Sequence, residues 1–153
     1  THFRWKDREG VHYNLHLHSF GSRKPWEDAH RDPWSFAFWA SYLRQYREAY
    51  RMRAHEIQQI RSLLAQETLP VIISGDFNST PHNGAFHGLS KGLQDAFKIA
   101  GRGWGATYHA DWPLARIDHI LVDPAWKVVS ARVIKTDFSD HKAVVVRLRW
   151  RDR

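Results

Sequence analysis

The chain has 153 residues, of which 42% are hydrophobic and 25% charged, a composition typical of a globular protein. Its length fits a single domain over residues 1–153 that can bury a sizeable core. Lysine and arginine outnumber aspartate and glutamate by 23 to 16, and the charge of +7 favours a partner that carries phosphate. The absence of cysteine excludes disulfides and thiolate metal sites. No apolar run is long enough to span a bilayer, and nothing indicates a compartment.

Two strands joined by a turn are predicted at the start of the chain. Residues 2–5 form a short strand, and residues 6–10 form a charged turn. Residues 11–18 then alternate between apolar and polar side chains, which is the period of a half-buried strand. The polar face of that strand carries His12, Asn14, His16 and His18. This face is either a solvated surface or part of a functional site.

A long amphipathic helix is predicted after a loop over residues 19–33. Asp32 and Pro33 are typical of the first residues of a helix. Apolar residues then recur at spacings of three, four and seven as far as Leu64. The pattern predicts one long helix, or two joined helices, ending near Gln66. The aromatic first half suits a core or interface role, and a substrate groove or a lipid surface are the alternatives.

A buried strand with a polar end is predicted at the centre of the chain. Residues 71–76 begin as an apolar run after Pro70, and the run breaks at Gly75 into a polar loop. Asp76 and Asn78 are two residues apart, so an extended chain would point both side chains to the same side. Residues of these types are also common in turns that have no function.

The rest of the chain is predicted to add short elements and three more strands. Residues 80–92 form a loop or short helix, and residues 93–99 form another short element. A glycine-rich loop over residues 101–105 precedes a brief edge strand at 107–108. Strands are expected at 117–122, 127–135 and 143–150. The predicted fold class is α/β, with a mixed or mainly antiparallel sheet on which the long helix packs.

Polar residues suited to phosphate chemistry occur at four places on or just beyond predicted strands: Asn14 and His16, Asp76 and Asn78, Asp118, and Asp140 with His141. Phosphoester hydrolysis needs a hard cation held by oxygen ligands, a base for the attacking water, and donors for the developing charge. Aspartate, asparagine and histidine at strand ends can supply all three. A zinc site is less expected, because histidine-rich zinc sites usually pair their histidines on one helix.

Four short motifs resemble, in order, those of the endonuclease/exonuclease/phosphatase superfamily. They are Asn14-Leu15-His16-Leu17, Gly75-Asp76-Phe77-Asn78-Ser79, Arg116-Ile117-Asp118-His119-Ile120 and Ser139-Asp140-His141-Lys142. Each motif is weak alone, but together they extend over nearly the whole chain. The resemblance implies a DNase I-like fold, in which this chain is the second half of a two-sheet sandwich. It also implies a Mg²⁺- or Mn²⁺-dependent hydrolase acting on a phosphodiester or phosphomonoester.

The resemblance further implies roles for the residues of the first two motifs. His16 would contact the scissile phosphate, and Asn14 would be a further phosphate contact. Asp76 and Asn78 would orient the attacking water and the phosphate, with Asp76 near a metal ion. These assignments apply only to the residues that match the motifs.

The last two motifs imply a paired acid and base. Asp118 would pair with His141 and fix the tautomer of its imidazole, as carboxylates do for general bases. Asp140 would be a ligand of Mg²⁺ or Mn²⁺. The resemblance leaves open whether Asp76 or His141 removes the proton from water.

The chain departs from the superfamily pattern before Asn14. Members of the superfamily carry an N-terminal half there, with an early asparagine and the principal metal-binding glutamate. Here Glu9 lies in a predicted turn and receives no such role. One face of the sheet would then lack its partner, and exposed apolar surface is unfavourable in water. A truncated or processed fragment, a homodimer and a partner chain are the explanations left open.

Two functions are therefore carried forward. The first is metal-dependent hydrolysis of a phosphate ester, with nucleic acid or a lipid headgroup as the substrate. The alternative is a non-catalytic half-domain that binds phosphates or assembles with a partner or a second copy. The basic charge favours nucleic acid modestly, although no recognition motif specific to DNA or RNA is present.

Overall fold

The computed structural model describes residues 1–19, 35–109, 111 and 114–151. Five strands form the larger of two sheets: β1 (His2–Trp5), β2 (Arg8–His16), β3 (Val71–Asp76), β4 (Gln94–Asp95) and β5 (Asp118–Val122). Their order in the sheet is β1-β2-β3-β5-β4. β2 and β3 are parallel, whereas the other neighbouring pairs are antiparallel. The sheet is therefore mixed, as predicted.

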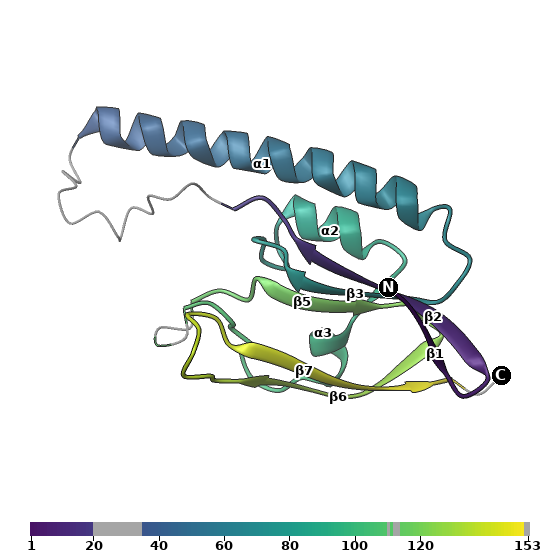
Figure 1. Cartoon of the computed structure of the whole chain (residues 1–153). Coiled ribbons are helices and arrows are strands. Elements are labelled where there is room, and N and C mark those ends of the chain that lie inside the picture. The colour runs from purple at the N-terminus through teal and green to yellow at the C-terminus, as the bar shows by residue number, and fades with distance from the viewer. Residues whose placement is uncertain (20–34, 110, 112–113, 152–153) are drawn as a thin grey trace.

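The last two strands, β6 (Trp126–Ile134) and β7 (Ala143–Trp150), form a separate antiparallel sheet. This hairpin packs against one face of the larger sheet, where Trp126 and Val122 share an apolar cluster (Figure 1). The rings of Trp126 and Trp150 stack there with their centroids 3.8 Å apart. The sequence analysis expected this face to lack a partner, and the hairpin of the same chain occupies part of it.

Two helices, α1 (Phe36–Leu64) and α2 (Gly84–Ser90), lie on the opposite face of the larger sheet (Figure 1). The core between helices and sheet consists of Val11, Leu17, Ile57, Val71, Ile73, Phe77, Ala85, Phe86, Leu89 and Leu121. Tyr13 and Leu15 pack against it, so the alternation predicted for residues 11–18 is confirmed. A short third helix, α3 (Ala96–Ala100), lies on the side of the hairpin.

α1 is one continuous helix, which was one of the two predicted alternatives. It begins at Phe36, where the Ser35 hydroxyl accepts a hydrogen bond from a first-turn N–H at 3.2 Å. The predicted start at Asp32-Pro33 lies outside the described residues. The helix ends at Leu64, close to the predicted end at Gln66. Among the described residues, no helix is both long enough and apolar enough to cross a membrane.

The shorter elements differ from the prediction in detail. α2 is the short helix expected within residues 80–92. The element expected at 93–99 consists of β4 followed directly by α3. The edge strand expected at 107–108 is reduced to isolated bridges, in which Tyr108 pairs with Ala115 and with His141. These bridges hold a loop against the segment that precedes β7.

Candidate active site

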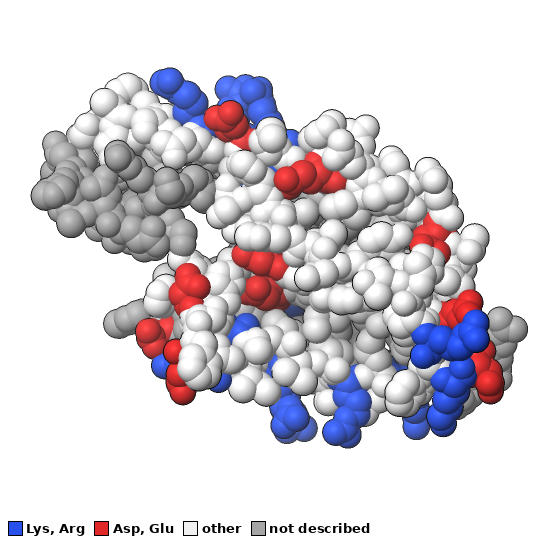
Figure 2. Space-filling view, in the orientation of Figure 1, with Lys and Arg blue, Asp and Glu red and all other residues white. Residues whose placement is uncertain are grey.

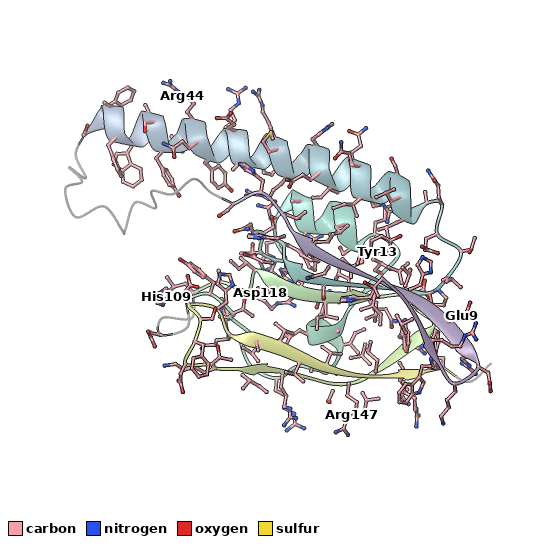
Figure 3. All side chains as sticks on the ribbon, viewed as in Figure 1. Glu9, Tyr13, Arg44, His109, Asp118 and Arg147 are labelled. Atoms are coloured by element: carbon pink, nitrogen blue, oxygen red, sulfur yellow. The ribbon has the colours of Figure 1, made fainter. Side chains whose placement is uncertain are left out.

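Strand register places three of the predicted residues in one row. His16 lies opposite Asp76 in the parallel pair β2–β3, and Asp76 lies opposite Asp118 in the antiparallel pair β3–β5. β2 and β3 end at this edge of the sheet, while β5 begins there. Residues far apart in the sequence are therefore neighbours. Acidic side chains lie here where the surface is hollowed between the α1 side and the hairpin, the region in which Asp118 is labelled (Figures 2 and 3).

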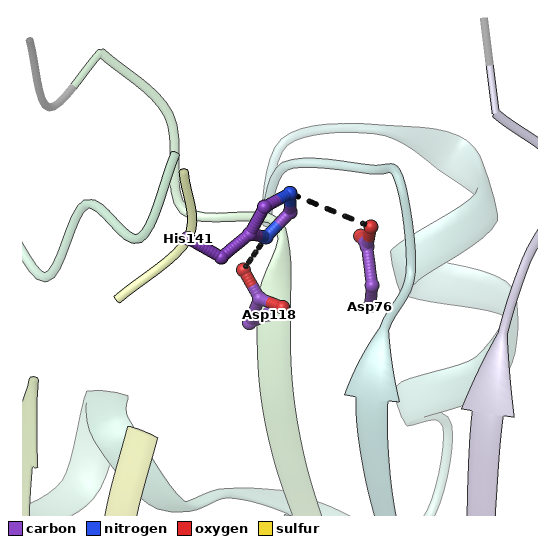
Figure 4. A group of neighbouring side chains, drawn as sticks. All are labelled: Asp76, Asp118 and His141. Atoms are coloured by element: carbon purple, nitrogen blue, oxygen red, sulfur yellow. Dashed lines mark hydrogen bonds and ion pairs between the residues drawn. The ribbon is translucent and has the colours of Figure 1, made fainter. Parts of the chain in front are cut away.

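His141 reaches this row from the segment between β6 and β7. Its Nδ1 is 2.8 Å from Asp118 Oδ2, and its Nε2 is 4.0 Å from Asp76 Oδ2 (Figure 4). A carboxylate can only accept, so Nδ1 carries the hydrogen and Nε2 of the neutral ring is left with a lone pair. The Tyr108 ring packs against the imidazole with centroids 4.9 Å apart. Asp118 thus orients the imidazole of His141 so that its Nε2 faces a second carboxylate, that of Asp76.

Asp76 is the least solvated member of the group, with 19% of its side chain exposed. Its Oδ1 accepts a hydrogen bond from Asn78 N–H at 2.8 Å, and its Oδ2 lies 3.8 Å from His16 Nε2. Burial raises the pKa of Asp76, and the Asp118 carboxylate adds to this effect. The Asn78 N–H and the two imidazoles lower the pKa but do not outweigh burial. Among the described residues, no lysine or arginine forms an ion pair with Asp76 within 4.0 Å, although the charge of the buried Arg53 acts on it from farther away.

Asn78 does not have the extended backbone that the same-side argument assumed. Its backbone is left-handed, with φ 46°, so the strand has already ended. Asn78 Nδ2 donates a hydrogen bond to the Leu17 carbonyl at 2.8 Å. The amide thus ties the end of β3 to the end of β2, next to His16.

Two further predicted residues lie at the margin of the group. Asn14 is exposed on β2, two positions before His16 and hence on the same face of the strand. Asp140, the predicted metal ligand, is exposed, and its role stays a prediction. Among the described residues, Asp76, Asp118 and His141 form a group that could hold a metal, with ligand atoms that all lie within 4.8 Å of one another.

The donor set of this group fits a divalent cation. Two carboxylates on adjacent strands lie directly opposite each other, an arrangement that like charges disfavour. Burial raises the pKa of Asp76, and the facing Asp118 carboxylate adds to this effect. Carboxylate oxygens suit Mg²⁺ and Mn²⁺, and water or substrate oxygens would complete their coordination. Asp76 and Asp118 are the residues that would hold such an ion, while His141 keeps its hydrogen bond to Asp118.

Thr107 is a contributor that the sequence analysis missed. It is completely buried, and its Oγ1 accepts hydrogen bonds from the N–H groups of Ile117 and Asp118, both at 3.1 Å. Its carbonyl accepts from Lys142 N–H at 2.8 Å. One residue therefore fixes both Asp118 and the residue that follows His141. A single threonine before a loop carries no sequence signal of this role.

Two residues of α1 fix the chain at the His16 end of the row, and the sequence analysis assigned this role to neither of them. Arg53 is 1% exposed and donates to the His18 carbonyl at 2.9 Å, while Glu56 accepts from His18 N–H at 2.9 Å. Both contacts fix the chain just beyond His16. A signal was present, because the apolar stripe of the helix skips from Tyr50 to Ile57 and the buried Arg53 lies in that gap.

His119, the histidine of the third motif, is part of the core. It is 1% exposed, lies against the rings of Phe77 and Phe86, and donates from Nε2 to the Ser79 carbonyl at 2.8 Å. Burial lowers the pKa of His119 to about 4. Its neutral ring therefore belongs to the core and lies outside the row that contains Asp118.

Comparisons with known proteins bear on the family and the fold of the chain. The model of the Endonuclease/Exonuclease/phosphatase family matches residues 4–141, whereas no curated protein matches the chain. A mannosyl-6-phosphatase from Bacteroides thetaiotaomicron VPI-5482 is similar in structure, with a TM-score of 0.65 at 23% identity over 97% of this chain and 55% of that one. A conserved protein of unknown function from Enterococcus faecalis V583 also has a TM-score of 0.65, at 19% identity over 95% and 52%.

The catalytic domain of human Nocturnin, solved with a bound sulfate anion, gives a TM-score of 0.59 at 20% identity over 94% and 48%. At these identities the similarity shows the fold, which is DNase I-like. The chain spans about half the length of each of the three structures. The family model covers most of the chain, including every residue of the row. This chain belongs to the endonuclease/exonuclease/phosphatase family.

Proposed function

We propose that the protein hydrolyses a phosphate ester with the help of a divalent metal ion, Mg²⁺ or Mn²⁺. The observation that carries this proposal is the row His16, Asp76 and Asp118, completed by His141 at 2.8 Å from Asp118. It combines an oriented base with two carboxylates that lie directly opposite each other on adjacent strands. When bound, the metal would polarise the phosphoryl oxygen and offset the charge that develops on it.

His141 is the residue we assign as general base. Asp118 holds the hydrogen of Nδ1 and stabilises the imidazolium that forms when Nε2 takes the proton of the attacking water. Asp76, with Nε2 of His141 at 4.0 Å, would orient that water and hold the cation together with Asp118. We thus assign the role of base to His141 and not to Asp76, a choice that the motifs alone left open.

His16 is the residue we assign to the substrate phosphate. Three quarters of its side chain is exposed, and its Nε2 faces Asp76 at 3.8 Å from the side opposite to His141. An imidazole at this place can donate to a phosphate oxygen and protonate a leaving group. Asn14 lies on the same face of β2 and would add a second contact. Asn78 would assist by holding the end of β2 in place.

Two of the similar structures support a phosphate-handling site. One is named as a mannosyl-6-phosphatase, and the Nocturnin domain holds a sulfate, an anion with the tetrahedral shape of phosphate. The net charge of +7 agrees with an anionic substrate.

Hydrolysis of bis-p-nitrophenyl phosphate and p-nitrophenyl phosphate, with Mg²⁺, Mn²⁺ or EDTA, tests the proposal. We expect metal-dependent release of p-nitrophenol by the wild type. His141→Ala and Asp118→Asn should each reduce it by about 10²- to 10⁴-fold, the usual contribution of a positioned base. His55→Ala is the matched control, since His55 is a surface histidine of α1. Equal rates in His141→Ala and the wild type would refute the assigned base.

The alternative is a non-catalytic phosphate-binding half-domain, alone or assembled with a partner or second copy. The observation that favours it is that the chain spans about half the length of its structural relatives. A folded chain that binds phosphate, but hydrolyses neither substrate with either metal, would support this alternative against the enzyme. Light scattering on the same sample would identify a homodimer.

A further inference from the structure

Trp104 is displayed on the surface by a turn built on two glycines. Its side chain is 80% exposed, and the flanking Gly103 and Gly105 have φ values of 77° and 70°. At Gly105 a Cβ atom would come within 2.3 Å of the Phe97 ring, so no larger residue fits there. The turn therefore depends on glycine and holds an indole outside the core. Single exposed aromatic residues are common, so this exposure alone indicates no function.

The surroundings of Trp104 connect it to the candidate active site. It lines a hollow of about 440 Å³ together with Lys142, Lys135 and Arg102. Lys142 also lines the hollow of about 360 Å³ that contains Asp118 and His141. Lys142 is the residue after His141, and its N–H is held by the Thr107 carbonyl at 2.8 Å. A surface thus runs from the catalytic residues past Lys142 to the indole.

The charges on this surface are mainly positive. Lys135 forms an ion pair with Asp111 at 2.8 Å, in which both side chains are largely exposed. Arg102 and Lys142 make no ion pair with any residue that the structure describes. The charge of Lys142 acts on Asp111 without forming an ion pair with it, so Arg102 and Lys142 both keep donors for a ligand beside the exposed ring. Cations next to an exposed aromatic ring are the features that bind single-stranded nucleic acids.

We propose that Trp104, Arg102 and Lys142 bind the nucleoside part of the substrate, which makes the substrate a nucleotide or a single-stranded nucleic acid. A base would stack on the Trp104 indole, while Arg102 and Lys142 would contact phosphates other than the one that is cleaved. This inference rests on the proposed function, because it places the remainder of a phosphate ester beside His141. A single sugar phosphate would leave one of the two cations without a partner.

Binding of a fluorescein-labelled eight-residue oligothymidylate, followed by fluorescence anisotropy in EDTA and low salt, tests the inference without turnover. We expect Trp104→Ala to weaken binding roughly 10- to 100-fold, the effect of losing a stacked base. Trp104→Phe should retain most of the affinity. Phe36→Ala is the matched control, because Phe36 is also an exposed aromatic residue, 86% accessible, at the start of α1.

The charged residues have a separate readout in the salt dependence of the same binding. Arg102→Ala and Lys142→Ala should each reduce the slope of log affinity against log salt by about 0.7, the value for one phosphate contact on a single strand. An abasic oligomer of equal charge should bind the wild type and Trp104→Ala alike. If it instead loses affinity in Trp104→Ala, base stacking is refuted.

Two results would overturn the inference. One is equal binding of the oligothymidylate by Trp104→Ala and the wild type. The other is that Trp104→Ala weakens binding of mannose 6-phosphate but not of the oligomer, which would assign the surface to sugar phosphates. Neither result affects hydrolysis of bis-p-nitrophenyl phosphate by the wild type. Failure of the subsite is therefore distinguishable from failure of the proposed function.

Discussion

Two aspartates at strand ends of the same sheet have opposite environments. Asp95, at the end of β4, accepts two hydrogen bonds from Arg116 at 2.9 and 2.6 Å, and it caps α3 by accepting two backbone N–H groups. Asp76, at the end of β3, accepts one backbone N–H, and among the described residues it forms no ion pair with lysine or arginine within 4.0 Å. The imidazoles of His16 and His141 lie at 3.8 and 4.0 Å, and the charge of the buried Arg53 acts on it from farther away. The two side chains are 7% and 19% exposed, so neither is well solvated.

Their pKa values move in opposite directions because of these partners. Burial alone would raise the pKa of Asp95, but the hydrogen bonds and charge of Arg116 outweigh it and lower the pKa. For Asp76, burial prevails and the pKa is raised. The difference teaches that a desolvated carboxylate in a close ion pair stabilises the fold, whereas one without a close ion pair, like Asp76, can take up a cation from outside.

Removing the cation of Asp95 should have the largest effect. Arg116→Met leaves a buried carboxylate without its partner, and we expect a loss of about 3–5 kcal/mol in the free energy of unfolding. Urea denaturation followed by circular dichroism measures it. Adding Asp95→Asn to this variant keeps the helix cap and removes the isolated charge, so part of the stability should return. No recovery would mean that Arg116 stabilises by packing alone.

Neutralising Asp76 should act in the opposite sense on stability. We expect Asp76→Asn to reduce hydrolysis on the order of 10²- to 10³-fold, as loss of an electrostatic contact does, and yet to raise the melting temperature. Because the pKa of Asp76 is raised by folding, its charge opposes folding at neutral pH. The gain should shrink as the pH falls towards the ordinary range of aspartate. A less stable variant at pH 7 would contradict this account of Asp76.

His119 lies near the Asp95–Arg116 pair and should make the stability of the region around this pair sensitive to acid. Its folded pKa of about 4 is below the ordinary 6.5, so the unfolded chain binds a proton more readily. Its contribution to stability is complete above pH 6.5 and should fall by about 3 kcal/mol as the pH falls through 4. His119→Gln keeps a donor for Ser79 and should lessen this loss in denaturant titrations at pH 7, 5.5 and 4. An identical pH dependence in the variant would exclude His119 as the cause.

A divalent cation should stabilise the region of Asp76 and leave that of Asp95 unaffected. At 100 times its dissociation constant, Mn²⁺ should add about 2.7 kcal/mol to the free energy of unfolding of the wild type. Asp76→Asn should lose this response, whereas Asp95→Asn should keep it. Thermal melts with Mn²⁺ and with EDTA measure both. A full response in Asp76→Asn would place the ion elsewhere, with the exposed Asp140 as the next candidate.

The sequence contained the elements of the site but not their juxtaposition. The alternation around His16 and the apolar run before Asp76 are local signals, and both strands are present. Register is a property of strand pairs, so the row from His16 to Asp118 could be expected only from the resemblance of the motifs. The same limit explains why the hairpin of β6 and β7 was not separated from the larger sheet.

Backbone conformation and buried side-chain contacts account for the other differences. The left-handed φ of Asn78 follows from the tight connection after β3, and no residue pattern requires it. One close contact is visible in the sequence as a glycine: at Gly75 a Cβ atom would come within 1.9 Å of the Leu15 carbonyl oxygen. The contacts of Thr107 and Arg53 join segments far apart in the chain. Such contacts depend on the complete fold, which local patterns do not encode.

The bridge between Tyr108 and Ala115 has a consequence for protein engineering. Both ends of the intervening segment are fixed, by backbone hydrogen bonds between those residues and by Thr107 beneath them. A longer segment inserted between them would begin and end at the same two points. Because each doubling of loop length adds only about 0.6 kcal/mol of closure entropy, insertions here should be tolerated. The position is therefore suited to insertions that leave the Asp118–His141 pair unchanged.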